Sequence, residues 1–117
     1  MGKFKELKVW QRAMELCVRI YKLTNIGEFA KDFELRGQVR KASVSVPSNI
    51  AEGDESGTNR QAVRFFNIAK GSIAEVQTQM IIAQKVGYVD IEQLSEIEAE
   101  CETISGMLMN LIKARSQ

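Results

Sequence analysis

Four segments of the chain carry hydrophobic residues at alternating steps of three and four positions. Three turn signals rich in Gly, Asn, Asp or Ser separate them, at Thr24–Gly27, Gly53–Asn59 and Gly87–Asp90. A spacing of three and four residues places side chains on one face of an α-helix. No segment alternates convincingly with the period of two that is typical of a strand. The pattern therefore predicts an all-α fold with four helices.

Three of these segments show a clear apolar face. The first face comprises Trp10, Ala13, Met14, Cys17, Ile20 and Tyr21. The second comprises Leu35, Val39, Ala42, Val46, Ile50 and Gly53, with Asn49 inside it. The fourth starts after a predicted N-cap, Asp90, and comprises Ile91, Leu94, Ile97, Cys101, Ile104, Leu108 and Leu111. Because short connections favour antiparallel neighbours, we expect residues 1–117 to form one antiparallel up-and-down four-helix bundle.

The third segment is apolar around much of its circumference. Its core face comprises Phe66, Ala69, Ile73, Val76, Met80 and Ala83. Ile68, Gly71 and Ile82 lie well away from that face, and Ile81 lies on its other flank. Such a helix is covered on a second side, by another helix of the chain or by another subunit. Since only four helices are available, we favour a subunit interface formed by these four residues.

The middle of the second helix contains three residues that disfavour helix interiors, in the stretch Ser45–Gly53, "SVPSNIAEG". Pro47 lacks an N–H, so the carbonyl of Ser43 loses its helical partner and we expect a kink there. Asn49 on the buried face needs hydrogen-bond partners inside the bundle. Gly53 either lets another backbone come close or ends the helix. This cluster is sufficiently explained as a device that sets helix geometry.

Composition and targeting signals point to an ordinary globular protein. Hydrophobic residues make up 44% and charged residues 26% of the chain. No apolar run approaches the ~20 residues that span a bilayer, and the lysine-containing start does not resemble a signal peptide. We therefore expect a cytoplasmic protein with no membrane partner. Cys17 and Cys101 are interpreted as small core residues, with a disulfide or a reactive thiol as the alternative.

The sequence offers no recognisable catalytic equipment. It has no histidine, which excludes Ser-His and Cys-His nucleophilic pairs and makes a metal site with either cysteine very unlikely. It has neither a P-loop nor a GxGxxG motif. Glu52 and Glu75 are a possible carboxylate pair across the bundle, but four-helix di-iron sites also require histidines. We expect neither an enzyme nor a cofactor or metal site.

Charge is unevenly distributed although the net charge is only +1. Residues 1–27 carry six basic and two acidic side chains, whereas residues 89–117 carry two basic and six acidic ones. One interpretation is solvated faces that steer packing between neighbouring helices. The other is a nucleic-acid surface made of a stripe about 25 Å long. This stripe comprises Lys5, Lys8, Arg12, Arg19 and Lys22.

Three sequence blocks carry a family resemblance. "FKELKVWQRAMEL", "LRGQVRKASVSVPSNIAEG" and "FFNIAKGSIAEVQTQMIIAQKVGYV" span residues 4–89. In order and spacing they resemble the four-helix-bundle family of proteins encoded in intervening sequences of 23S ribosomal RNA genes. Its motif positions here, interpreted as structural, are Pro47, Asn49, Glu52, Gly53, Ser72 and Glu75. We expect Asn49, Glu52 and Gly53 near the end of the second helix, and Ser72 and Glu75 on the facing part of the third or at the edge of a subunit contact.

The resemblance implies an antiparallel four-helix bundle that assembles as a homopentamer. A structurally similar accessory protein of diversity-generating retroelements is a basic pentamer that binds nucleic acid and a reverse transcriptase. Two hypotheses follow for this chain. The first is an oligomeric RNA- or DNA-binding accessory protein that uses the basic side chains of the first and third helices, and the second is a protein-interaction scaffold with no nucleic-acid role.

Overall fold

The computed structural model describes residues 2–116 as helices joined by short connections. A short 3-10 helix, Phe4–Glu6, precedes α1 (Lys8–Leu23), α2 (Gly27–Lys31), α3 (Phe33–Glu55), α4 (Asn59–Lys85) and α5 (Ile91–Arg115). None of residues 2–116 lies in a strand, which confirms the all-α prediction. The hydrophobic pattern identified the four longer helices, but it missed the 3-10 helix and α2, which are too short to show a period.

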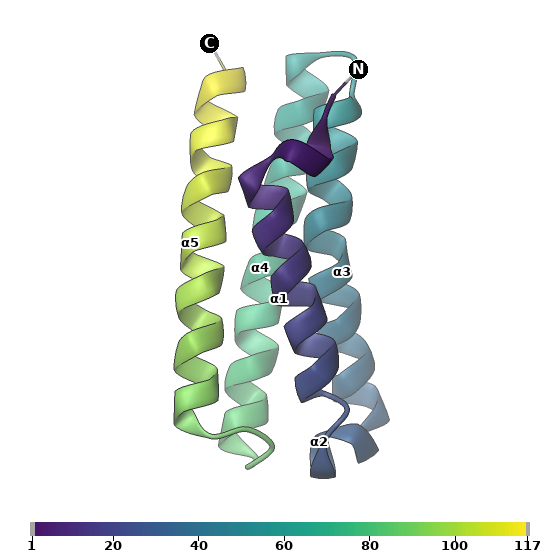
Figure 1. Cartoon of the computed structure of the whole chain (residues 1–117), viewed down its shortest axis with the longest axis vertical. Helices are drawn as coiled ribbons and strands as arrows, with labels where there is room; N and C mark the ends of the chain where they lie inside the picture. Colours follow the sequence, from purple (N-terminus) through teal and green to yellow (C-terminus); the bar gives the residue numbers. More distant parts are fainter. Residues whose placement is uncertain (1, 117) are drawn as a thin grey trace.

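The four longer helices lie side by side along the long axis of the molecule (Figure 1), whose extents are 45 × 21 × 20 Å. In that view the chain runs down α1, up α3, down α4 and up α5, so that residues 2 and 116 lie at the same end. The most extensive contact is between α3 and α4, followed by α4 with α5 and α1 with α3. The contact between α1 and α5 is the sparsest of the four. None of the helices in residues 2–116 has the length and apolar character needed to cross a membrane.

The core confirms most of the predicted apolar faces. All six predicted core residues of α4 are buried, as are Val39, Ala42, Val46 and Ile50 of α3. On α5 the buried set is Leu94, Ile97, Cys101, Ile104 and Leu108. Ile91 is 61% exposed because it is the first residue of α5, before the helix meets its neighbours.

The predicted core face of α1 is partly wrong. Its buried residues are Val9, Ala13, Leu16 and Ile20, whereas Met14 and Tyr21 are exposed. Both sets follow the helical spacing, since α1 is apolar over a wide arc. The two neighbours that α1 contacts, α3 and α5, decide which part of that arc faces the core. Met14 and Tyr21 are thus left at the surface.

Caps and a small aromatic contact hold the ends of α3 and α5. Asp90 caps α5 in a capping box with Gln93, which confirms the predicted N-cap. Asp32 caps α3 by accepting a hydrogen bond from Leu35 N, and its other oxygen accepts one from the Tyr88 hydroxyl at 2.8 Å. These hydrogen bonds, the Leu35 one first, lower the pKa of Asp32. Phe29 of α2 is fully buried and packs on the Tyr88 ring, which fixes this short helix.

Gly53 allows a close approach between α3 and α4. A Cβ atom added to Gly53 would lie 2.5 and 2.8 Å from two atoms of the buried Phe66 ring. Helix α3 continues to Glu55, so the alternative that Gly53 ends the helix is wrong. Pro47 is buried inside α3, and the kink expected there stays a prediction.

We expect Gly53→Ala to lower the free energy of unfolding by about 1–2 kcal/mol, because overpacking against Phe66 outweighs the helix propensity gained. Gly37→Ala in the same helix is the matched control, since a Cβ there meets nothing within 4 Å. It should raise stability by about 0.5–1 kcal/mol. Urea unfolding of both variants at one protein concentration measures the difference. Equal shifts for the two variants would contradict the close-contact assignment.

Candidate functional site

One side of the molecule brings together two sets of residues that were predicted separately. On α3, residues with a 4-3-4-3 spacing lie along the groove towards α4, and residues of α4 with the same spacing line its other wall. We call this surface the α3/α4 face. It comprises Gln38, Ala42, Ser45, Asn49 and Glu52 of α3 and Ile68, Ser72, Glu75, Gln79 and Ile82 of α4. Four motif positions therefore share a face with Ile68 and Ile82, namely Asn49, Glu52, Ser72 and Glu75. The other two, Pro47 and Gly53, are buried, and Gly71 lies exposed at the edge of the face.

Two hollows continue along this face. One, of about 290 Å³, is lined by Gln38, Lys41, Ala42, Ser45, Glu75 and Gln79. The other, of about 250 Å³, is lined by Asp32, Glu34, Leu35, Gln38, Ile82, Val86 and Tyr88. Because Gln38 lines both hollows, they form one shallow trough between α3 and α4.

A hydrogen-bonded group of small polar side chains forms the floor of the α3/α4 face. The buried Ser72 hydroxyl lies 2.8 Å from Ser45 Oγ and 3.1 Å from the Ile68 carbonyl oxygen, with one proton to donate between them. Asn49 Nδ2 donates to Ser45 O at 2.8 Å and to Ser45 Oγ at 2.9 Å. Asn49 is therefore hydrogen-bonded as predicted, although its partner is one turn earlier in its own helix. Sequence reasoning missed Ser45 as the centre of this group.

The other polar groups of the face are not satisfied in the same way. Gln79 Oε1 is buried and has no hydrogen-bond partner among residues 2–116. Glu52 and Glu75 are both exposed. They lie on opposite sides of the level marked by Ser45 and Ser72, about 15 Å apart along the axis at 1.5 Å per residue. This separation excludes the carboxylate pair considered from the sequence.

Ile81 does not belong to the α3/α4 face. It is partly buried and packs against the core, so intrachain contacts account for its apolar character. Ile68 and Ile82, by contrast, are 42% and 44% exposed. Of the four residues predicted for a subunit contact, Ile68, Gly71 and Ile82 are therefore the ones on an open surface.

Gly53, one of the motif positions, belongs to a cluster of side chains near one end of the molecule. Gly53 receives the Phe66 ring, and the Arg115 guanidinium lies over that ring, 5.8 Å from its centroid. Arg115 also donates to Asp54 Oδ1 at 3.3 Å. This end cluster joins α3, α4 and α5, which supports the structural interpretation of Gly53.

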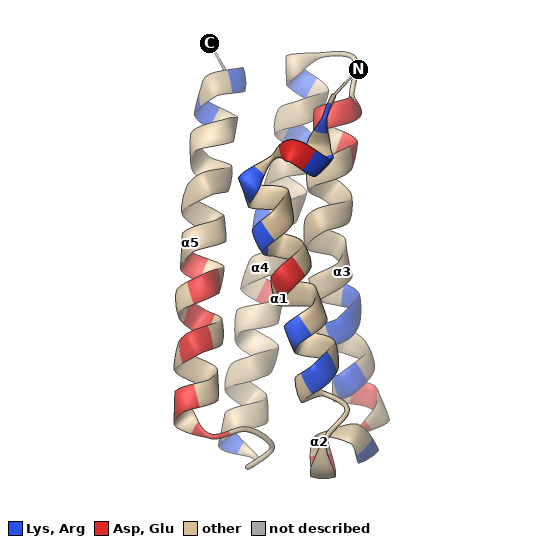
Figure 2. Cartoon of the chain, viewed as in Figure 1, with Lys and Arg blue, Asp and Glu red and all other residues tan. Residues whose placement is uncertain are grey.

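The basic stripe is divided between paired and unpaired side chains. Arg12 forms a bidentate ion pair with Glu100, in which Nε and Nη2 donate to the two carboxylate oxygens at 2.8 and 2.9 Å. Arg19 pairs with Glu96. The Glu100 hydrogen bond raises the pKa of Arg12. Figure 2 shows that the acidic residues of α5 are concentrated in the half of that helix next to the α4–α5 connection. The two arginines thus steer packing between α1 and α5.

The stripe's lysines, by contrast, stay exposed. Lys5, Lys8 and Lys22 have no ion pair within residues 2–116.

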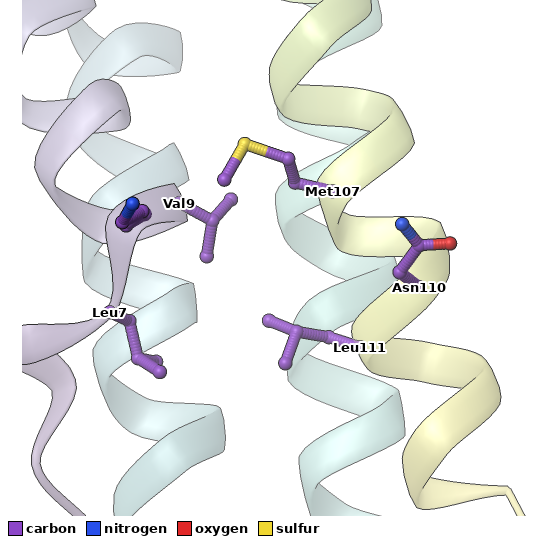
Figure 3. Close-up of a pocket in the computed structure, with 6 residues that line it drawn as sticks. Leu7, Val9, Met107, Asn110 and Leu111 are labelled. Carbon is purple, nitrogen blue, oxygen red and sulfur yellow. The ribbon is translucent and has the colours of Figure 1, made fainter.

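A separate apolar pocket of about 310 Å³ opens between the start of α1 and the end of α5. Figure 3 shows Leu7, Val9, Met107 and Leu111 around it, and Lys8 and Asn110 complete its lining. Lys8 is its one charged lining residue, and the other five residues are apolar or an amide.

The two cysteines are free thiols. Cys101 is fully buried, and burial raises the pKa of its thiol to about 12. This confirms the core-residue interpretation for Cys101. Cys17 is half-buried and accepts a weak hydrogen bond from the Ser43 hydroxyl at 3.5 Å. Within residues 2–116 no three His, Cys, Asp or Glu side chains are grouped closely enough to hold a metal ion.

Comparison with known proteins identifies a family and solved structures with a similar fold. The family model described as 23S rRNA-intervening sequence protein matches residues 5–110 and so extends into α5. No curated protein matches the chain. A crystal structure of a protein of unknown function from the S23 ribosomal protein family of Bacteroides thetaiotaomicron VPI-5482 is similar, with a TM-score of 0.82 and 24% identity. The similarity covers 90% of this chain and 98% of that one, and at this identity it shows the fold alone.

We expect Ser72→Ala to lower the free energy of unfolding by about 1 kcal/mol, because it removes the hydroxyl bridge between α3 and α4. Asn49→Ala should also lower the melting temperature, and the double variant should be non-additive since both side chains share Ser45. Thr78→Ala is the control, because Thr78 bonds only to Ala74 O of its own helix. An unchanged melt for Asn49→Ala together with lost ligand binding would make this cluster a functional site instead.

Proposed function

The chain belongs to the family of 23S rRNA-intervening sequence proteins, and from this premise we propose that it is a homo-oligomeric scaffold without catalytic activity. Its unit is an antiparallel four-helix bundle with a kink at Pro47. The α3/α4 face is the contact surface between subunits. The polar motif residues lie on the same face as the exposed isoleucines, so they would form part of the subunit contact.

This proposal rests on exposed isoleucines that lie beside polar side chains, one of which lacks a hydrogen-bond partner. Ile68 and Ile82 expose 42% and 44% of their surface on one face of α4. The two side chains are 14 residues apart, about 21 Å along α4, and a row of apolar positions with helical spacing along a groove suits a partner helix lying in it. Between them, Gln79 Oε1 is buried with no donor among the described residues. A helix of another subunit would cover the isoleucines and supply the missing hydrogen bond.

The number of subunits follows from the resemblance to the family, which implies a homopentamer. A pentamer would have a mass of five times 13.2 kDa. Five copies would also repeat every surface feature around one axis, which multiplies weak contacts with an extended partner. The partner of such a scaffold is an RNA or DNA on one hypothesis and a protein on the other.

We expect light scattering to give a mass several times 13.2 kDa, most simply fivefold. Ile82→Glu should dissociate the assembly while helical circular dichroism stays largely intact, because burying an unpaired charge at an interface is costly. Ile91→Glu is the matched control. That side chain is 61% exposed in the first turn of α5, where a carboxylate suits the helix dipole. A wild-type monomer at micromolar concentration would contradict the proposal.

Nucleic-acid binding is the second candidate function, and the unpaired lysines of the basic stripe favour it. Lys5 and Lys8 are exposed near the start of α1, away from the acidic half of α5. Lysines offer charge to phosphates but little for reading base edges, so such binding would be electrostatic and indifferent to sequence. Repetition in a ring would raise the avidity of a weak single contact.

We expect the wild-type oligomer to bind labelled RNA and DNA, with affinity falling steeply between low and physiological salt. Lys5→Gln with Lys8→Gln should weaken binding further, whereas Lys31→Gln with Lys85→Gln, which removes the same charge elsewhere, should not. Substitutions of Arg12 and Arg19 would also break their ion pairs with α5 and are less informative. No binding at low salt would leave the protein-partner scaffold in place of this function.

A further inference from the structure

A second apolar surface lies on the outer side of α1. Met14, Val18 and Tyr21 are 38%, 50% and 42% exposed. Their spacing of four and three residues puts them on one side of the helix, and we call them the α1 ridge. A hollow of about 460 Å³ beside the ridge is lined by Met14, Glu15, Val18, Arg19 and Lys22. The chain therefore has two apolar surfaces that its own core does not use.

We propose that the α1 ridge of one copy packs into the α3/α4 face of the next copy. The inference rests on the proposed function, since it requires a homo-oligomer, and it names the surface that covers the α3/α4 face. The contact joins two different surfaces, so each subunit gives its ridge to one neighbour and its face to the other. Contacts of this kind close into rings of even or odd numbers of copies.

The shapes of the two surfaces suit each other. The α1 ridge is a single row of side chains at positions i, i+4 and i+7, which is the anchor pattern of a helix that lies in a groove. The α3/α4 face is a trough between two helices, with Ile82 in its lining and small side chains such as Ala42 and Ser45 along its floor. The exposed Ile68 lies on the same face of α4, one turn before Ser72. One row of side chains fits between two walls, whereas two rows would not.

The charges of the two surfaces are opposite. The hollows of the α3/α4 face are lined by Lys41 and by the three carboxylates Asp32, Glu34 and Glu75, a balance of −2. The hollow beside the α1 ridge is lined by Glu15, Arg19 and Lys22, and Arg19 is paired with Glu96 of α5. The ridge therefore takes its positive charge from Lys22 and from Arg40, against the one carboxylate of Glu15. Opposite potentials of this kind favour the correct pairing of surfaces and oppose contacts between two like faces.

Two polar groups strengthen this match. The Arg40 guanidinium lies over the Tyr21 ring, 4.6 Å from its centroid, and adds a further positive charge to the ridge. On the other surface, Gln79 Oε1 is a buried acceptor with no donor within residues 2–116. The ammonium of Lys22 of the next copy is a donor of the kind that this oxygen lacks. Lys22 would then be covered in the oligomer, which leaves Lys5 and Lys8 as the free lysines.

A mixing experiment with two variants tests this pairing. Val18→Glu disables the α1 ridge and keeps the α3/α4 face, whereas Ile82→Glu disables the face and keeps the ridge. Each variant alone should be monomeric by light scattering. An equimolar mixture should form a 1:1 complex of about twice 13.2 kDa and grow no further, because only one good ridge and one good face remain. Ile91→Glu mixed with wild type should give the full assembly.

The outcomes separate this inference from the proposed function. A monomeric wild type would overturn both. A second variant, Val18→Lys, places the opposite charge on the ridge. If the wild type is oligomeric and both Val18→Glu and Val18→Lys assemble normally, the ridge is not part of the contact, and only this inference is overturned. If both variants are monomeric but their mixture gives no 1:1 complex, the contact joins like surfaces and the inference is wrong. Circular dichroism of each variant confirms that its helices are intact, and Val18 tolerates charge in the monomer because it is half exposed.

Discussion

The close approach of α3 and α4 is the constraint on which the rest of the structure depends. It requires a glycine at position 53, because Phe66 occupies the space where a side chain would begin. About two turns away, the Ser45 and Ser72 hydroxyls bridge the same two helices at 2.8 Å. Small residues at both points explain why the contact between these helices is the most extensive in the molecule. The family's motif is thus a packing motif first.

That packing also shapes the surface above it. Because the floor between α3 and α4 is made of small side chains, it stays shallow and polar, and the exposed isoleucines of α4 lie along the same face. The surface has the shape of a groove between two helices, and its two glutamates are about 15 Å apart along the helix axis. This combination is the basis on which we propose a function through assembly.

Some charged side chains are paired between α1 and α5, and others are left at the surface. Arg12 and Arg19 form ion pairs with glutamates in the acidic half of α5. These pairs join α1 to α5, which have the least extensive contact among the neighbouring long helices. Exposed ion pairs of this kind add little stability, but they favour one arrangement of neighbours over others. Among the remaining charges, Lys22 and Arg40 lie beside the α1 ridge, and three carboxylates, Asp32, Glu34 and Glu75, line the hollows between α3 and α4. A chain with a net charge of +1 can therefore carry strong local complementarity.

The sequence by itself determined the helices, most of the core and the family, since a period of three and four residues reports which side of a helix is apolar. It also separated the apolar excess of α4 from its core face. It did not determine which part of the wide apolar arc of α1 is buried, nor that Arg12 and Arg19 are paired. Nor did it identify Ser45 as the centre of the polar cluster. These depend on which helix lies beside which, and only the tertiary structure decides that, because neighbours far apart in sequence set the burial and the partners of each side chain.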